Sequence, residues 1–260
     1  MSTPTVVLLH GQPDSSASFW ALRHALAGRL PESVRVIAPD RPGYGANPAH
    51  ATDFEGNVAW LRQWLRRISA GPVVLVGHSW AGAVAALAAA DAATDSGLPI
   101  AALLLLSSIG PGCLLPLDPW LAAPGLGEAI AYTTLGLGRG PVTRKVAHIL
   151  RRYTPPDDVP YAWASGAATR HRPLWRSFLT EQRAMVAKLG DVDRRLPQIQ
   201  VPTLVVSGTS DSVIPARTPQ ALAAAIPGSR HVPIAGGHDL QLRQPDAVAV
   251  HIAGLVEQVW

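Results

Sequence analysis

Short apolar runs alternate with amphipathic stretches over the first 110 residues and again after residue 197. Continuous Val, Leu and Ile runs are typical of strands buried on both faces, whereas apolar residues three and four apart are typical of helices that cover a sheet. The pattern predicts strands over Thr5–Leu9, Val34–Ala38, Val73–Val76, Ile100–Leu106, Pro202–Ser207 and Arg230–Ile234. It predicts helices over Ser18–Leu30, Phe54–Ile68, Ala81–Ala93, Ala216–Ala225 and Asp246–Trp260. This alternation indicates an α/β fold, with a mostly parallel sheet and helices on both faces.

The alternation stops between Pro111 and about Pro197, where no run has the character of a buried strand. Proline-rich breaks separate stretches that read as short helices, over Ala129–Thr134, Val142–Tyr153, Pro160–Thr169 and Leu174–Leu189. A structureless loop of this length is improbable in a compact domain. We therefore predict a helical cap over residues 111–197, inserted into a core domain made of residues 1–110 and 198–260.

Only four residues, Gly77 to Trp80, separate the strand that begins at Val73 from the helix that begins at Ala81. A strand that turns into a helix so quickly places its middle residue, Ser79, on a sharp and strained corner. Such a corner exposes a hydroxyl beside a helix N-terminus, where backbone N–H groups can stabilise an oxyanion. The segment therefore predicts a nucleophile elbow. The alternative is that Ser79 only caps the following helix, because serine is a favoured N-cap residue.

Ser79, Asp211 and His238 each follow a predicted strand at its carboxyl end, the edge of a parallel sheet where functional loops gather. A serine hydroxyl becomes a useful nucleophile when an imidazole takes its proton and a carboxylate fixes the imidazole tautomer. The three residues supply these groups in the order Ser, Asp, His. Asp118 is a weaker alternative for the acid, and Asp239 is expected to point away in a tight turn.

These residues resemble the α/β-hydrolase family, and in particular its capped members. The similarity rests on the elbow, the Ser-Asp-His order, the cap and His10-Gly11 after the first strand. It implies an α/β-hydrolase fold and an oxyanion hole formed by the backbone N–H groups of Trp80 and Gln12. Pro13 has no N–H to donate, which favours Gln12.

The resemblance also implies an activity, which is that of a serine hydrolase that cleaves a small to medium, largely apolar carboxylic ester through an acyl-enzyme. No cofactor or metal is expected. Carbon–carbon bond hydrolysis, lactone opening, haloperoxidase-like perhydrolysis and lyase chemistry stay open because they use the same triad. A ligand receptor that retains the fold is the alternative from another class.

Several other residues receive a structural interpretation. His10 and His78 are expected to orient or pack, and the turn-rich loop Asp40–Gly45 to reverse the chain. The apolar segment Ile109–Leu117 is expected to roof the pocket, with a purely adhesive role as the alternative. Three tryptophans could line the substrate pocket under the cap or belong to its core, namely Trp120, Trp163 and Trp175.

The composition limits the class of protein and the partners that it can have. The 260 residues are 48% hydrophobic and 15% charged, enough to bury a large core. The 22 Lys and Arg residues and 18 Asp and Glu residues are scattered, without a basic stripe for nucleic acid. Cys113 is the single cysteine, which excludes an internal disulfide. The chain shows no signal-peptide pattern and no run of the ~20 apolar residues that a membrane span needs. We expect a cytoplasmic protein whose partner is a small-molecule substrate, with no nucleic acid or membrane, and leave the oligomeric state open.

Overall fold

The structure is a computed structural model that describes residues 4–68, 71–95, 98–136 and 173–260. These residues contain a six-stranded sheet with the order β2-β1-β3-β4-β5-β6. Every pair of neighbouring strands is parallel. The strands are β1 (Thr5–Leu9), β2 (Arg35–Ile37), β3 (Val73–His78), β4 (Ile100–Leu106), β5 (Thr203–Gly208) and β6 (Arg230–Ile234).

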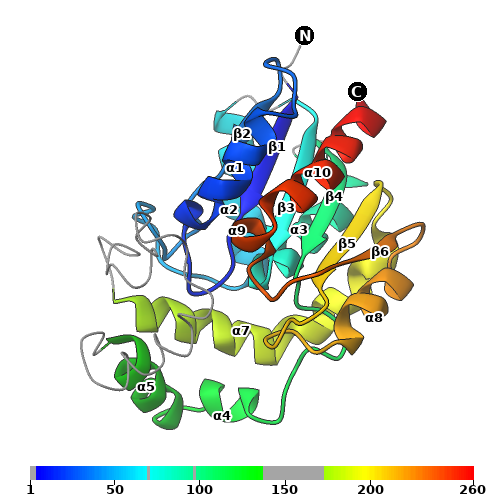
Figure 1. Cartoon of the computed structure of the whole chain (residues 1–260). Coiled ribbons are helices and arrows are strands. Elements are labelled where there is room, and N and C mark those ends of the chain that lie inside the picture. Colours follow the sequence, from blue (N-terminus) through cyan, green and yellow to red (C-terminus); the bar gives the residue numbers. More distant parts are fainter. Residues whose placement is uncertain (1–3, 69–70, 96–97, 137–172) are drawn as a thin grey trace.

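Helices cover both faces of this sheet (Figure 1). On one face lie η1 (Ser16–Phe19), α1 (Trp20–Ala27), α9 (Leu240–Arg243) and α10 (Pro245–Val259). On the other lie α2 (Phe54–Arg67), α3 (Trp80–Ala92), α7 (Leu174–Arg195), η4 (Leu196–Gln198) and α8 (Arg217–Ala225). The inserted region also contributes α4 (Asp118–Ala122), α5 (Leu126–Ala131) and η2 (Tyr132–Gly136).

Strand β4 shows why its apolar run specifies a central strand. Leu103 and Leu105 pack with α2, α3 and α7, while Leu104 and Leu106 pack with α1 and α10. Successive side chains of a strand point to opposite faces, so a strand covered on both faces needs apolar residues at every position. The predicted α/β fold is confirmed.

Element ends differ from the sequence predictions in a few places. The predicted helix Ser18–Leu30 is replaced by η1 and by α1, which ends at Ala27 with Gly28 at its C-cap. Helix α7 runs six residues past the predicted Leu189, to Arg195, because Val192 continues its buried face. The segment predicted as Ala129–Thr134 is divided between α5 and η2.

Two predicted cap helices, Val142–Tyr153 and Pro160–Thr169, lie outside the described residues, as does Trp163. The division at residues 111 and 197 stays a prediction. Helix α7 nevertheless shares the hydrophobic core of the sheet, because Ala184, Met185 and Leu189 are buried in the cluster that contains α3. Figure 1 shows α7 running across the carboxyl ends of the strands, with α4 and α5 beyond it. None of the described helices has the length and hydropathy of a membrane span.

Candidate active site

Ser79 occupies a strained corner between β3 and α3. Its φ of 54° and ψ of −122° lie in a region that residues with a side chain rarely adopt. The corner fits because its neighbours are small: a Cβ at Gly77 would lie 2.7 Å from the Ala81 carbonyl oxygen, and one at Gly82 would overlap the Ser108 hydroxyl. Ser79 stands at the N-cap position, yet its side chain makes no capping hydrogen bond to α3. The hydroxyl is therefore left for another partner.

That partner is His238, in the loop that follows β6. The Ser79 Oγ lies 3.0 Å from His238 Nε2, and His238 Nδ1 lies 2.9 Å from the Asp211 Oδ2 in the loop after β5. The second carboxylate oxygen of Asp211 accepts the backbone N–H groups of Val213 and Ile214 at 2.8 and 3.0 Å. The Asp211 carboxylate is thus fixed on both sides. The structure brings together the three residues that the sequence analysis selected.

The surroundings of Asp211 favour the ionised form of its carboxyl group. Burial opposes the charge on Asp211, but the hydrogen bond and charge of His238 and the N–H groups of Ile214 and Val213 outweigh it, so the pKa of Asp211 is lowered. An ionised Asp211 accepts the Nδ1–H of His238. This tautomer leaves a lone pair on Nε2 for the proton of Ser79.

The alternative acids lie elsewhere. Asp118, at the start of α4, accepts the amide of Gln182 at 2.9 Å through Oδ1 and the backbone N–H of Leu115 at 2.7 Å through Oδ2. Asp239 follows His238 in the chain and contacts the amide of Gln241 at 3.5 Å. Among the described residues, His238 therefore pairs with Asp211, and Asp118 bonds to Gln182 of α7 and to Leu115.

The two predicted oxyanion donors belong to the two segments that meet at Ser79. Trp80 is the first residue of α3, so its backbone N–H has no acceptor one turn earlier in the helix. Gly11, directly before Gln12, approaches the elbow so closely that a Cβ on it would lie 2.8 Å from the Ser79 Cβ. This contact sets the loop after β1 against the elbow. The donor role of Gln12 and Trp80 stays a prediction.

The two histidines beside these motifs are buried and neutral. Burial and the nearby Arg41 guanidinium hold the pKa of His10 well below its usual value, and its Nδ1–H donates to the Gly11 carbonyl at 2.8 Å. Burial and the charge of His238 lower the pKa of His78 to about 4. The Nε2 of His78 lies 3.4 Å from the His238 carbonyl oxygen. His10 thus contacts the loop after β1, and His78 contacts the loop that carries His238.

Arg41 and Glu181 form a buried ion pair, and the sequence analysis predicted neither residue. The loop Asp40–Gly45 does turn, since the Tyr44 N–H donates to the Arg41 carbonyl at 3.1 Å, but the Arg41 side chain is fully buried. It pairs with Glu181 of α7, which is also fully buried. One signal was available: Glu181 stands four residues after Ser177 and four before Met185, both on the buried stripe of α7.

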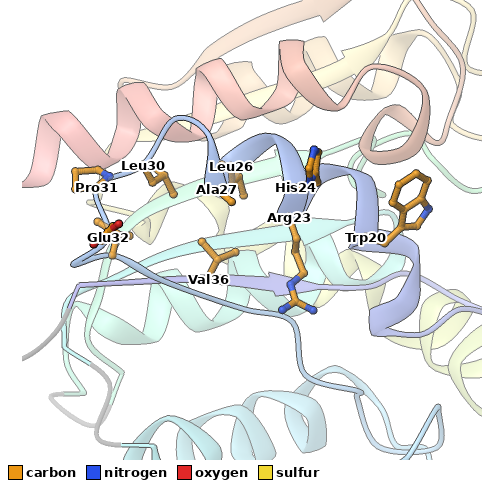
Figure 2. A pocket seen from close by; sticks show the side chains of 10 residues that line it. Trp20, Arg23, His24, Leu26, Ala27, Leu30, Pro31, Glu32 and Val36 are labelled. Atoms are coloured by element: carbon orange, nitrogen blue, oxygen red, sulfur yellow. The ribbon is translucent and has the colours of Figure 1, made fainter.

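A cavity of about 590 Å³ lies at the far edge of the sheet, between α1 and β2 (Figure 2). Its lining includes Trp20, Arg23, His24 and Val36, and none of the residues of the Ser79 site. No group of three or more His, Cys, Asp and Glu side chains in the described part of the chain could hold a metal ion.

Comparison with known proteins identifies both similar sequences and similar structures. It is 28% identical over 257 residues to an uncharacterized protein of Mycobacterium tuberculosis, covering 88% of this chain and 68% of that protein. A bromoperoxidase from Bacillus anthracis superposes with a TM-score of 0.73 at 21% identity, covering 98% of this chain and 92% of the other. A thermophilic esterase from Thermogutta terrifontis superposes with a TM-score of 0.71 at 22% identity, covering 99% and 91%. The sequence matches the Alpha/beta hydrolase family over residues 6–251, so the chain belongs to this family.

Proposed function

We propose that the protein is a serine hydrolase that cleaves a small to medium, largely apolar carboxylic ester through an acyl-enzyme. The observation that carries this proposal is the hydrogen-bonded row from Asp211 through His238 to the strained Ser79. Serine at the elbow also decides against an alkyl-enzyme ester, which requires a carboxylate nucleophile.

The first half of the proposed reaction forms the acyl-enzyme. The Ser79 Oγ attacks the ester carbonyl carbon while its proton passes to His238 Nε2, and Asp211 stabilises the resulting imidazolium. The carbonyl oxygen takes up the negative charge and is bound by the N–H groups of Gln12 and Trp80. When the carbon–oxygen bond to the alcohol breaks, His238 returns the proton to the leaving oxygen.

The second half releases the acid. A water molecule gives a proton to His238 Nε2 and attacks the acyl carbon, and the same backbone N–H groups bind the second oxyanion. The bond to Ser79 Oγ then breaks, His238 returns the proton to this oxygen, and the carboxylic acid leaves. Each proton transfer has His238 Nε2 as one partner, and the other partner is Ser79, the leaving alcohol or water.

The test is a panel of esters of short and medium acyl chains, with a lactone and a carbon–carbon bond substrate as further arms. The wild-type protein and Ser79→Ala are assayed side by side, and the wild type is labelled with a fluorophosphonate and mapped by peptide mass spectrometry. We expect ester turnover that Ser79→Ala abolishes and covalent labelling at Ser79 alone. Labelling at another serine, or turnover that survives in Ser79→Ala, would overturn the proposal. If the protein binds these compounds but turns over neither the esters, the lactone nor the carbon–carbon bond substrate, the result would favour a ligand receptor.

A further inference from the structure

Arg41 uses its whole donor set inside the protein. A guanidinium has five N–H donors in a rigid planar fork. Arg41 Nη1 donates to the Glu181 carboxylate and to Asn57 Oδ1 at 3.3 Å, and Nη2 donates to Glu181 Oε2 at 3.3 Å. Tyr44 donates its hydroxyl proton to the same Glu181 oxygen at 2.7 Å. The carboxylate of α7 is thereby fixed against the loop after β2.

The remaining donors of Arg41 reach the loop that precedes Gln12. Nε donates to the carbonyl of His10 at 2.7 Å, and Nη2 donates to the carbonyl of Gly11 at 2.9 Å. The backbone N–H of Arg41 donates to His10 Nε2 at 3.0 Å. Arg41 therefore holds both peptide groups that lead into Gln12.

The same pair of residues also contacts Trp80, which carries the other proposed donor. The backbone carbonyl of Glu181 accepts the indole N–H of Trp80 at 3.2 Å. The guanidinium carbon of Arg41 lies 4.8 Å from the centroid of the Trp80 ring, and Phe54 stacks on that ring with centroids 4.6 Å apart. The first residue of α3 is thus fixed through its side chain.

We infer that the buried Arg41–Glu181 pair is a positioning device for the oxyanion hole. Arg41 fixes the Gln12 loop, and the Glu181 carboxylate holds α7 against Arg41, so that the Glu181 backbone carbonyl fixes Trp80. This inference rests on the proposed function. A buried ion pair is a poor source of stability, because the desolvation of both charges offsets their attraction. Oxyanion donors, in contrast, gain their effect from being held in place before the charge develops, and small displacements reduce the rate strongly.

The central test compares two single variants, Arg41→Lys and Glu181→Gln, with the wild type. Lysine keeps the charge but concentrates three donors on one nitrogen, so it cannot reach Glu181 and both carbonyls at once. We expect kcat to fall at least tenfold with KM within about twofold. The affinity for a trifluoromethyl ketone, which forms a tetrahedral oxyanion adduct with the serine, should fall in parallel with kcat. Glu181→Gln should show a smaller loss of the same kind.

The matched control is Lys188→Met on the same helix. Lys188 makes half-exposed ion pairs with Asp53 and Glu55, and its hydrogen bonds to residues that the structure describes do not reach the Gln12 loop or Trp80. We expect it to keep both kcat and the affinity for the ketone. Melting temperatures and the fraction of labelled active sites are measured for all three variants, so that kcat is expressed per folded molecule.

The outcomes separate this inference from the proposed function. If the wild type hydrolyses esters and both variants keep kcat and ketone affinity per folded molecule, the pair only holds the fold together and the inference is wrong. If Arg41→Lys does not fold, the inference is tested with Glu181→Gln and with the uncharged double variant Arg41→Met, Glu181→Met. For these proteins too, kcat and the affinity for the ketone are measured, and unchanged values would overturn the inference. If the wild type itself neither turns over esters nor labels at Ser79, the proposed function fails and the inference fails with it.

Discussion

A Cβ on Gly11 would lie 2.8 Å from the Cβ of Ser79, so the loop after β1 and the elbow after β3 meet with no room for a side chain. The same added atom would lie 3.3 Å from His78 Nδ1. Neither Ser79 nor Gly11 can yield easily, because the first belongs to a strained corner and the second is held by Arg41. The loop that carries Gln12, the proposed oxyanion donor, therefore lies directly against the elbow that carries Ser79.

We expect Gly11→Ala to lower kcat for an ester at least tenfold, because the methyl group must push the loop away from Ser79. Gly254→Ala is the matched control, since a Cβ at this position in α10 meets nothing within 4 Å. It should keep kcat and raise the free energy of unfolding by about 0.5–1 kcal/mol, as glycine is unfavourable inside a helix. Steady-state kinetics and chemical denaturation measure both. Equal kcat in Gly11→Ala and the wild type would contradict the proposed geometry.

We expect Asp211→Asn to lower kcat by about 10⁴-fold while the protein stays folded. The amide oxygen can still accept the N–H groups of Val213 and Ile214, so the loop keeps its turn. The carboxylate that selects the Nδ1–H tautomer of His238 is lost, and Nε2 no longer offers a lone pair to Ser79. Kinetics on the best ester and a near-ultraviolet circular dichroism spectrum give the two readings.

The control for this variant is Asp118→Asn, which removes a carboxylate bonded to Gln182 and not to His238. Its rate should fall by less than tenfold. A severe loss in Asp118→Asn together with a mild one in Asp211→Asn would transfer the role of the acid to the residue in α4.

Asp14, two residues after Gln12, should make stability depend on pH. Burial raises the pKa of Asp14 to about 7 against the opposing hydrogen bonds from Ser18 and the Ser15 N–H, and the charge of Asp239 adds to the rise. A carboxyl whose pKa is higher in the folded protein binds more protons when folded, so its contribution is complete below pH 4 and is lost as the pH rises to about 7. The loss amounts to about 4 kcal/mol, since the pKa rises from 3.8 to about 7 and each pKa unit corresponds to ~1.4 kcal/mol.

Denaturant unfolding of the wild type and Asp14→Asn between pH 4 and 8 measures this contribution. Relative to the variant, the wild type should lose stability as the pH rises and level off above about pH 7. A constant difference between the two proteins over this range would show that Asp14 has an ordinary pKa.

Much of the fold could be predicted because it depends on local pattern. The unbroken apolar run in β4 indicates burial on both faces, and its bounds are the predicted Ile100–Leu106. Parallel strands then bring the residues after their carboxyl ends to one edge, which is why the topology alone could bring Ser79, Asp211 and His238 together. No distance along the sequence enters this argument, although Ser79 and His238 are 159 residues apart.

The Arg41–Glu181 pair could not be predicted in the same way. Arg41 and Glu181 are 140 residues apart. Arg41 lies in the loop after β2 and Glu181 lies within helix α7, so the rule that brings together residues after the carboxyl ends of strands does not apply to them. An arginine in a turn-rich loop is usually solvated, and a glutamate in an amphipathic helix is usually exposed. Their burial depends on where α7 crosses the sheet edge, and this crossing is a tertiary property that periodicity does not contain. Only the position of Glu181 on the buried stripe of α7 gave a sign of it.

The last prediction concerns the segment Ile109–Leu117, where the chain leaves β4 for the cap. Ile109 and Cys113 are buried and anchor the segment, whereas Leu114 and Leu115 keep 38% and 44% of their surface exposed. Half-exposed leucines contribute little to the core, so Leu114→Asp and Leu115→Asp should leave the melting temperature near that of the wild type. If these side chains roof an apolar pocket, at least one variant should lose preference for longer acyl chains, by about fourfold for each methylene at ~0.8 kcal/mol. An ester series of increasing chain length, with Ile109→Asp as the variant expected to unfold, measures both effects. Loss of stability with unchanged relative preferences would mean that the segment only joins the cap to the sheet.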